Sequence, residues 1–208
     1  MKLDPRVTCT ALVGGFLLGF LDFVWIKFVP FPFAALGNSS AVWAVAAFAF
    51  GYWVRSGWLR AGFGAATLLV VAVPSYYLAA VWIQHDDWAS IWAPSSWLWM
   101  CFGVVAGAVF GVAGVWARGT GWRQAVGVAL PGAVLLAEAI TLPRRIGDPD
   151  YGTQTLWPAV IETLLGLLVV TLLTRGGRRR LTAVVLALPL ALLGWAALAL
   201  APLGGVNQ

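Results

Sequence analysis

Long apolar stretches alternate with short polar ones along the whole chain, and this pattern predicts a bundle of membrane-spanning helices. A transmembrane helix needs about 17 to 25 predominantly apolar residues. Seven stretches of roughly this kind are predicted as spans, at residues 9–29, 40–55, 61–83, 97–117, 124–142, 157–174 and 181–202. The predicted fold class is therefore all-α, a polytopic transmembrane helix bundle of about seven helices that forms a single domain over residues 1–208.

The composition agrees with this prediction. The chain is 61% hydrophobic and 10% charged, whereas an ordinary soluble domain is about 25% charged. The lipid bilayer is therefore the expected partner, and a multi-pass protein of the cell membrane is the expected location. Cys9 and Cys101 lie near opposite ends of their predicted spans, so no disulfide between them is expected.

The basic residues predict the orientation in the membrane. Positively charged loops face the cytoplasm in most membrane proteins. One side of the bundle receives most of the basic residues, namely Lys2, Arg6, Arg55, Arg60, Arg118, Arg123, Arg175, Arg178, Arg179 and Arg180. The N-terminus is therefore expected inside and the C-terminus outside. Because lipid headgroups or a stop-transfer anchor account for the basic stretch at 175–180, no nucleic acid is expected as a partner.

Asp22 is the strongest candidate functional residue. On a helix it shares one stripe with Gly15, Gly19 and Ile26, because residues three and four apart are neighbours. A Gly-x-x-x-Gly face allows another helix to approach closely, so this stripe is expected to face the bundle interior. An ionisable side chain inside a span costs about 2.5 to 3.5 kcal/mol on insertion scales and is typical of a functional site. A structural hydrogen bond to a neighbouring helix is the alternative interpretation.

Two other acids interrupt hydrophobic runs on the same predicted side of the membrane. Glu138 lies near the outer end of the fifth span, where Arg144 and Arg145 are close enough in sequence to form a salt bridge with it. Glu162 lies in the first turns of the sixth span, where a carboxylate also suits the positive end of the helix dipole. The candidate catalytic acids are therefore Asp22, Glu138 and Glu162.

Aromatic residues are the second unusual feature, with 13 tryptophans in the chain. Many fit the belt of Trp and Tyr at membrane interfaces. Others lie deep in, or cluster around, the outer half of the predicted bundle. The candidate substrate-binding residues are Phe20, Phe23, Trp25, Tyr76, Tyr77, Trp82, Trp99 and Trp157.

Motifs for metal or cofactor chemistry do not stand out. A metal site needs three or four ligands of defined geometry, and the only histidine, His85, beside Asp86 and Asp87 is interpreted as a solvated loop residue. The sequence has no Gly-rich phosphate loop with its lysine, no His-Glu-x-x-His and no Cys-x-x-Cys motif. No metal and no cofactor are therefore expected.

An acid that projects into an aromatic cavity has a specific chemistry. An apolar environment favours the neutral carboxyl group, which is a general acid. Aromatic faces attract positive charge, by about 0.5 to 2 kcal/mol each. An acid that protonates an alkene or epoxide, next to aromatic rings that stabilise a carbocation and exclude water, is what isoprenoid cyclisation requires. A hydrophobic prenylated substrate would enter from the bilayer.

In its size, helix number, aromatic content and embedded acids, the chain resembles the small bacterial integral-membrane terpene cyclases that cyclise farnesylated small molecules, as in drimane-type indole alkaloid pathways. The resemblance implies cyclisation of a farnesylated substrate, initiated by protonation. The sequence departs from soluble cyclases, because Asp86-Asp87-Trp88-Ala89-Ser90 lacks the last aspartate of DDxxD and residues 148–151 (DPDY) are half of DxDD. The proton donor is therefore expected among the membrane-embedded acids.

Two other functions stay open. The first is a small-solute or proton-coupled transporter or channel in which Asp22, Glu138 and Glu162 form the relay. The second is a structural or assembly partner, and a homo-oligomer is also left open. A cyclase needs a closed pocket, whereas a transporter needs polar residues through the full thickness of the membrane. The inner halves of the spans are poor in polar residues, which favours the pocket.

Overall fold

The computed structural model describes residues 4–55, 57–142, 156–174 and 177–200. The elements are α1 (Pro5–Phe28), the 3₁₀-helix η1 (Phe33–Asn38), α2 (Ser40–Val54), α3 (Trp58–Gln84), the 3₁₀-helix η2 (Trp88–Trp92), α4 (Pro94–Ala117), α5 (Gly121–Thr141), α6 (Leu156–Leu173) and α7 (Gly177–Leu200). No strand occurs in the described ranges. The predicted all-α fold with seven long helices is confirmed.

The chain is a polytopic membrane protein. By length and composition, five helices can cross a membrane, namely α1, α3, α4, α5 and α6. The apolar helices at Ser40–Val54 and Arg180–Ala196 are shorter than these five. The sequence predicted seven spans, of which the one at residues 40–55 corresponds to α2 with 15 residues.

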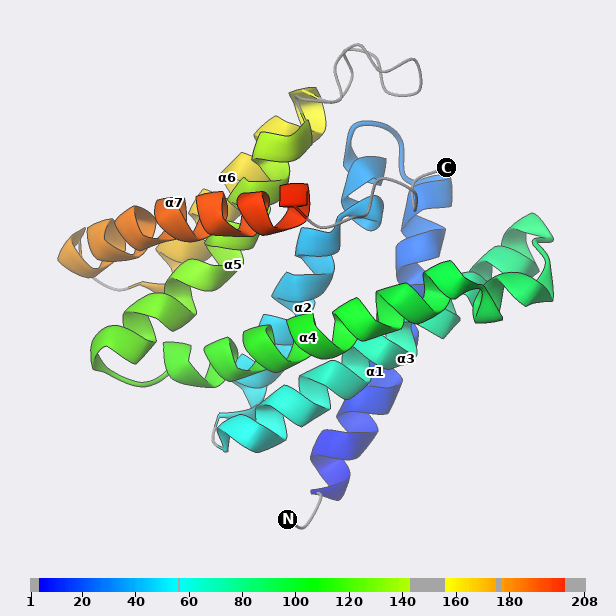
Figure 1. Cartoon of the computed structure of the whole chain (residues 1–208), viewed down its shortest axis with the longest axis horizontal. Coiled ribbons are helices and arrows are strands. Elements are labelled where there is room, and N and C mark those ends of the chain that lie inside the picture. The colour runs from blue at the N-terminus through cyan, green and yellow to red at the C-terminus, as the bar shows by residue number, and fades with distance from the viewer. Residues whose placement is uncertain (1–3, 56, 143–155, 175–176, 201–208) are drawn as a thin grey trace.

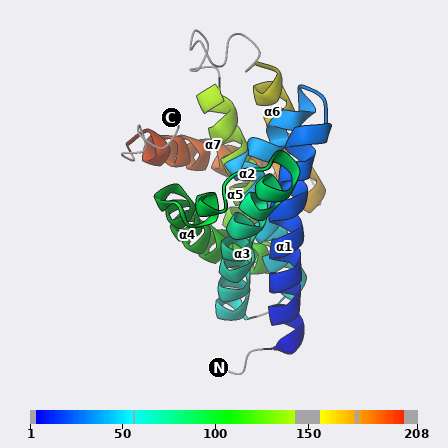
Figure 2. The ribbon, with the colours of Figure 1, turned by 90° about the vertical axis from the view of Figure 1, so that its right-hand side faces the viewer.

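The helices form two groups that meet near α2 (Figure 1). In the first group α3 packs against both α1 and α4, and α4 also packs against α2. In the second group α5 packs against both α6 and α7. The contacts of α5 with α4 and α2 join the groups. Helices α1 and α7 lie on opposite sides of the bundle (Figure 2).

Glycine stripes bring the backbones of the first group together. A Cβ atom at Gly15 would meet the carbonyl oxygen of Leu68, and one at Gly19 would meet the carbonyl oxygen of Ala72. The predicted close approach of a helix to the Gly-x-x-x-Gly face of α1 is therefore confirmed, and that helix is α3. Gly107 of α4 contacts the α3 backbone in the same way. Small residues replace large ones here because van der Waals packing, rather than the hydrophobic effect, drives helix association in lipid.

The link between α1 and α2 folds back alongside the last turns of α1. The indole N–H of Trp25 donates a hydrogen bond to the carbonyl oxygen of Phe33 over 2.8 Å. A Cβ atom at Gly37 would lie 3.0 Å from the carbonyl oxygen of Asp22, so η1 packs directly on the α1 backbone at this level. Helix α2 therefore begins level with Asp22 rather than with the end of α1.

Candidate functional site

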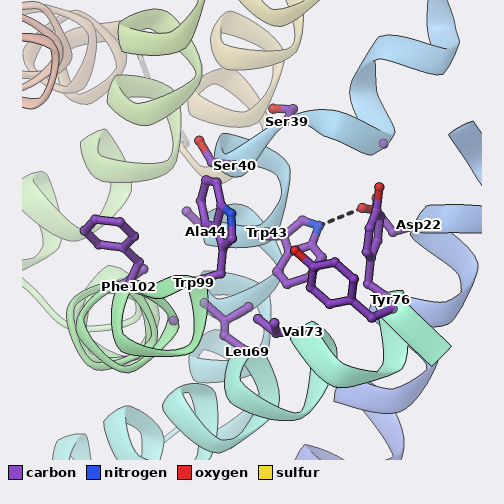
Figure 3. Close-up of a pocket in the computed structure, with 14 residues that line it drawn as sticks. Asp22, Ser39, Ser40, Trp43, Ala44, Leu69, Val73, Tyr76, Trp99 and Phe102 are labelled. Atoms are coloured by element: carbon purple, nitrogen blue, oxygen red, sulfur yellow. Dashed lines mark hydrogen bonds between the residues drawn. The ribbon is translucent and has the colours of Figure 1, made fainter. Parts of the chain in front are cut away.

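Asp22 lies at the junction of α1 and α2. Its side chain is only 9% exposed, and its Oδ2 atom accepts a hydrogen bond from the indole N–H of Trp43 over 2.9 Å (Figure 3). A tryptophan N–H can only donate. The carboxyl group is therefore held through one oxygen, and the other oxygen can carry a proton.

A cavity of about 230 Å³ lies between α2, α3 and α4, with Asp22 in its wall. Figure 3 shows Ser39 and Ser40 on one side of it, Leu69 and Val73 on the opposite side, and Trp99 and Phe102 of α4 on the side away from Asp22. Five aromatic residues are in the lining: Trp43, Tyr76, Tyr77, Trp99 and Phe102. The site is thus an apolar, aromatic cavity with one carboxyl group.

The aromatic rings near Asp22 support one another. The ring of Tyr76 makes edge contacts with Phe23 on α1 and Trp43 on α2, with centroids 5.3 and 6.5 Å apart. It also contacts Tyr77 at 5.5 Å. Such edge-to-face pairs contribute about 0.5 to 1.5 kcal/mol beyond the area they bury. Tyr76 therefore lines the cavity and also packs against the rings that hold the cavity wall in place.

A second cavity, of about 620 Å³, lies on the other side of α2. Its walls come from α1, η1, α2, α3, α5 and α6 and are almost entirely apolar, with Trp25 and Asp22 among them. Asp22 and Gly37 line both cavities. Asp22 therefore borders two apolar spaces.

The N-terminus of α2 is polar, because the first N–H groups of any helix have no partner within the helix. The Oε2 atom of Glu138 accepts hydrogen bonds from the Ala41 backbone N–H at 2.7 Å and from the Ser40 hydroxyl at 3.0 Å. The Ser39 hydroxyl accepts a further one from the Val42 N–H. Glu138, a predicted catalytic acid, therefore caps α2.

Glu162 lies close to this cap. It is 2% exposed, its carboxyl group is hydrogen-bonded by the Ser39 side chain, and it lies close enough to Glu138 for the two to interact electrostatically. Its Oε2 atom has no hydrogen-bond partner. The structure thus brings Glu138 and Glu162 together. Ser39 and Ser40 separate this pair from Asp22, which lines the same smaller cavity as the two serines.

The predicted substrate-binding residues divide into two sets. Tyr76, Tyr77 and Trp99 line the smaller cavity, and Trp25 lines the larger one. Four others line neither cavity: Phe20, Phe23, Trp82 and Trp157.

These four residues point elsewhere for separate reasons. Phe23 is buried with Ala79 and Ala80 of α3, behind Tyr76. Phe20 packs between Phe16 and Trp82. The side chains of Trp82 and Trp157 are 58% and 62% exposed, as expected of interfacial tryptophans. The predicted residues therefore include rings that face a cavity and rings on other faces of the same helices.

Sequence reasoning missed Trp43, Phe102, Ser39 and Ser40. Trp43 and Phe102 lie in apolar runs where nothing distinguishes them from ordinary packing or belt residues. The Ser39-Ser40 pair at the start of a span was the available signal, because serine is a preferred helix N-cap. If the serine pair had been interpreted as a helix cap, a search for a further capping acid would have led to Glu138.

The remaining polar candidates lie away from the site. Asp87 caps η2 through the Ala89 N–H, and His85 is exposed at the end of α3. Within the described ranges no group of three or more His, Cys, Asp and Glu side chains is placed to hold a metal ion. Cys9 and Cys101 are exposed free thiols. Arg144 and Arg145, the predicted partners of Glu138, lie outside the described residues.

Comparison with known proteins gives a family. No curated protein and no solved structure matches the chain significantly. One family model, described as a family of unknown function (DUF6518), matches residues 4–204. Because that match covers the seven helices and the whole site, the chain belongs to the DUF6518 family.

Proposed function

We propose that this protein is a membrane-embedded terpene cyclase that starts cyclisation by protonating a prenylated substrate. The observation that carries the proposal is the position of Asp22, whose carboxyl group lies in the wall of an aromatic cavity and is held through one oxygen by Trp43. That arrangement leaves the second oxygen available to carry and deliver a proton. The farnesylated substrates of the cyclases that the sequence resembles are the first class to test.

The proposed reaction balances without a co-reactant. The neutral Asp22 carboxyl group gives its proton to one carbon of a substrate double bond, whose π electrons form the new C–H bond. The other carbon becomes a carbocation, and the π electrons of the next double bond close the ring. Loss of a proton to the Asp22 carboxylate then restores the acid. The product is an isomer of the substrate, with unchanged mass.

The lining of the cavity supports this chemistry. Aromatic faces attract a cationic centre, and the attraction is strongest where water is excluded. Trp43, Tyr76 and Trp99 provide such faces, while Leu69 and Val73 form an apolar wall. Positioned aromatic groups and a dry cavity protect a carbocation from capture by water.

The two cavities are compatible with a substrate whose isoprenoid tail and head group lie on opposite sides of Asp22. At about 230 Å³ the smaller cavity lies just below the range of about 300 to 1,000 Å³ that is usual for ligand pockets. The larger cavity provides about 620 Å³ on the other side of Asp22. In this proposal the tail occupies the smaller cavity, and the substrate enters from the lipid of the cell membrane.

The test is a product assay. Membranes containing the wild-type protein are incubated with a farnesylated indole and other prenylated acceptors, without added metal, and the products are analysed by mass spectrometry. Membranes containing the Asp22→Asn variant are the control. A product of unchanged mass and altered retention in the wild-type sample alone supports the proposal. The absence of any conversion across the acceptors would contradict it.

Proton-coupled transport of a small solute is the second candidate, because Asp22 borders cavities on both sides of α2. An acid that is reached alternately from two spaces is typical of a proton relay. Apart from Asp22, the two serines at the start of α2 and the polar groups of a few aromatic side chains, however, apolar groups line both cavities. Uptake into proteoliposomes driven by a pH gradient would favour transport over cyclisation.

A further inference from the structure

Two glutamates from different helices meet at the start of α2. Glu138 comes from α5 and Glu162 from α6, and they are the only glutamates in the chain. Glu138 accepts hydrogen bonds from two groups of the first turn of α2, and Ser39 joins that turn to Glu162. Ionisation of Glu162 places a second negative charge near Glu138 in the membrane bundle, and repulsion between like charges disfavours it.

The surroundings of Glu162 offer it polar groups but no cation within the described part of the chain. Helix α5 contributes Glu138, and the start of α2 contributes the hydroxyls of Ser39 and Ser40. Across α2, Asp22 of α1 is a further acid. The stretch of α7 from residue 181 to residue 196 carries no charged or titratable side chain.

One carboxyl oxygen of Glu162 has no hydrogen-bond donor in these surroundings. The Ser39 hydroxyl accepts from the Val42 N–H and hydrogen-bonds the Glu162 carboxyl group. The Oε2 atom of Glu162 is buried and has no partner. A buried carboxylate oxygen without a donor costs the full desolvation penalty of a charged group. A proton on this carboxyl group removes the charge and gives the atom a donor to share with the neighbouring acid.

We propose that Glu138 and Glu162 form a proton-binding site that holds one exchangeable proton and exchanges it with the Asp22 cavity through Ser39. Ser39 lines that cavity and also bonds Glu162. A proton delivered to the Ser39 oxygen from the cavity releases the hydroxyl proton of Ser39 to Glu162, and the reverse transfer returns it. Only O–H bonds form and break. The inference goes beyond the proposed function, because such a site would serve a transporter as well as an enzyme.

Isotope-edited infrared spectroscopy tests the proposal directly on the wild-type protein in lipid. The protein is made by cell-free synthesis with ¹³C-labelled glutamate, which labels only Glu138 and Glu162. The C=O stretching band of a protonated carboxyl group at neutral pH is expected to shift on labelling, and this shift is expected to be absent in Glu162→Gln. A spectrum in which no protonated carboxyl band shifts would mean that both glutamates are ionised and would overturn the proposal.

Labelling with ¹³C-aspartate instead marks every aspartate, and the band that is lost in Asp22→Asn reports on Asp22. Failure of the cyclase mechanism and failure of this proposal are therefore distinguishable. The Ser39→Ala variant tests the connection to the cavity. Its glutamate band is expected to exchange with D₂O more slowly than the wild-type band, which a purely structural Ser39 would not cause. An exchange rate equal to that of the wild type would overturn the role of Ser39. Loss of the band on addition of Na⁺ would identify a cation site instead and overturn the proposal.

Discussion

The indole N–H of Trp43 donates a hydrogen bond to Asp22 Oδ2 over 2.9 Å, and this bond joins α2 to α1 where the two helices otherwise make few contacts. It ties the candidate acid to the wall of the aromatic cavity. It also depends on the fold-back of η1, which sets the start of α2 level with Asp22. The experiments below separate the chemical role of this pair from its structural role.

Replacement of Asp22 by asparagine is expected to abolish conversion in the product assay while the protein stays folded. The amide oxygen of asparagine still accepts from Trp43, but the side chain has no acidic proton to give. Conversion and thermal unfolding are measured in parallel on purified protein. An active Asp22→Asn variant would rule out Asp22 as the proton donor.

Trp43→Phe is expected to lower both conversion and stability. The ring remains in the cavity wall, but the Asp22 carboxyl group loses its donor, at a cost of about 1 to 3 kcal/mol in the free energy of unfolding. Trp53→Phe is the matched control, because Trp53 lies on the same helix, is 50% exposed and makes no hydrogen bond with the described residues. Equal effects of the two substitutions would show that the Trp43 N–H has no special role.

Gly19→Ala is expected to lower the free energy of unfolding by about 1 to 3 kcal/mol, the usual cost of overpacking. The added methyl group would meet the backbone carbonyl of Ala72, which cannot move without displacing α3. Gly14→Ala is the control, because its Cβ would meet only the flexible end of Leu68, at 3.4 Å. Chemical denaturation in detergent measures both, and equal losses would contradict close packing of α1 on α3.

Removal of a cavity ring is expected to weaken conversion without unfolding the protein. Trp99→Ala removes one aromatic face from the cavity, and a loss of about 0.5 to 2 kcal/mol of cation–π attraction corresponds to a decrease of about 2- to 30-fold in kcat/KM. Trp157→Ala removes an exposed ring that lines neither cavity, and kcat/KM is expected to stay unchanged. A larger decrease of kcat/KM in Trp157→Ala than in Trp99→Ala would place the substrate site at the start of α6 instead.

Glu138→Ala is expected to destabilise the bundle more than Glu138→Gln. The alanine variant leaves the buried Ala41 N–H without the acceptor that it shares with the exposed Ser40 hydroxyl, which costs about 1 to 3 kcal/mol for the buried donor. Glutamine retains a carbonyl oxygen that can accept from the same donors. Thermal unfolding of both variants is the measurement, and equal melting temperatures would argue against the capping role.

The sequence pattern predicted the positions of the helices and one buried face of α1. The predicted spans agree with the helices to within a few residues at most ends, since α3 covers residues 58–84 where 61–83 was predicted. Asp22 was correctly expected on a buried stripe with Gly15 and Gly19. The predicted span at 40–55 likewise corresponds to α2 at Ser40–Val54. The fold-back of η1 beside α1 was not anticipated, because it depends on contacts with α1 that leave no periodic signal.

The sequence by itself determined the class of the molecule, its helices and the burial of Asp22. Bilayer lipid offers no partner to backbone N–H and C=O groups, so long apolar runs must form helices, and glycine spacing then selects the face that packs. The tertiary structure alone decided which rings meet Asp22 and that Glu138 and Glu162 meet at the start of α2. A tryptophan in the interfacial belt and one in a cavity wall have the same local sequence signal. Only the crossing of the helices and the level at which α2 begins distinguish the two.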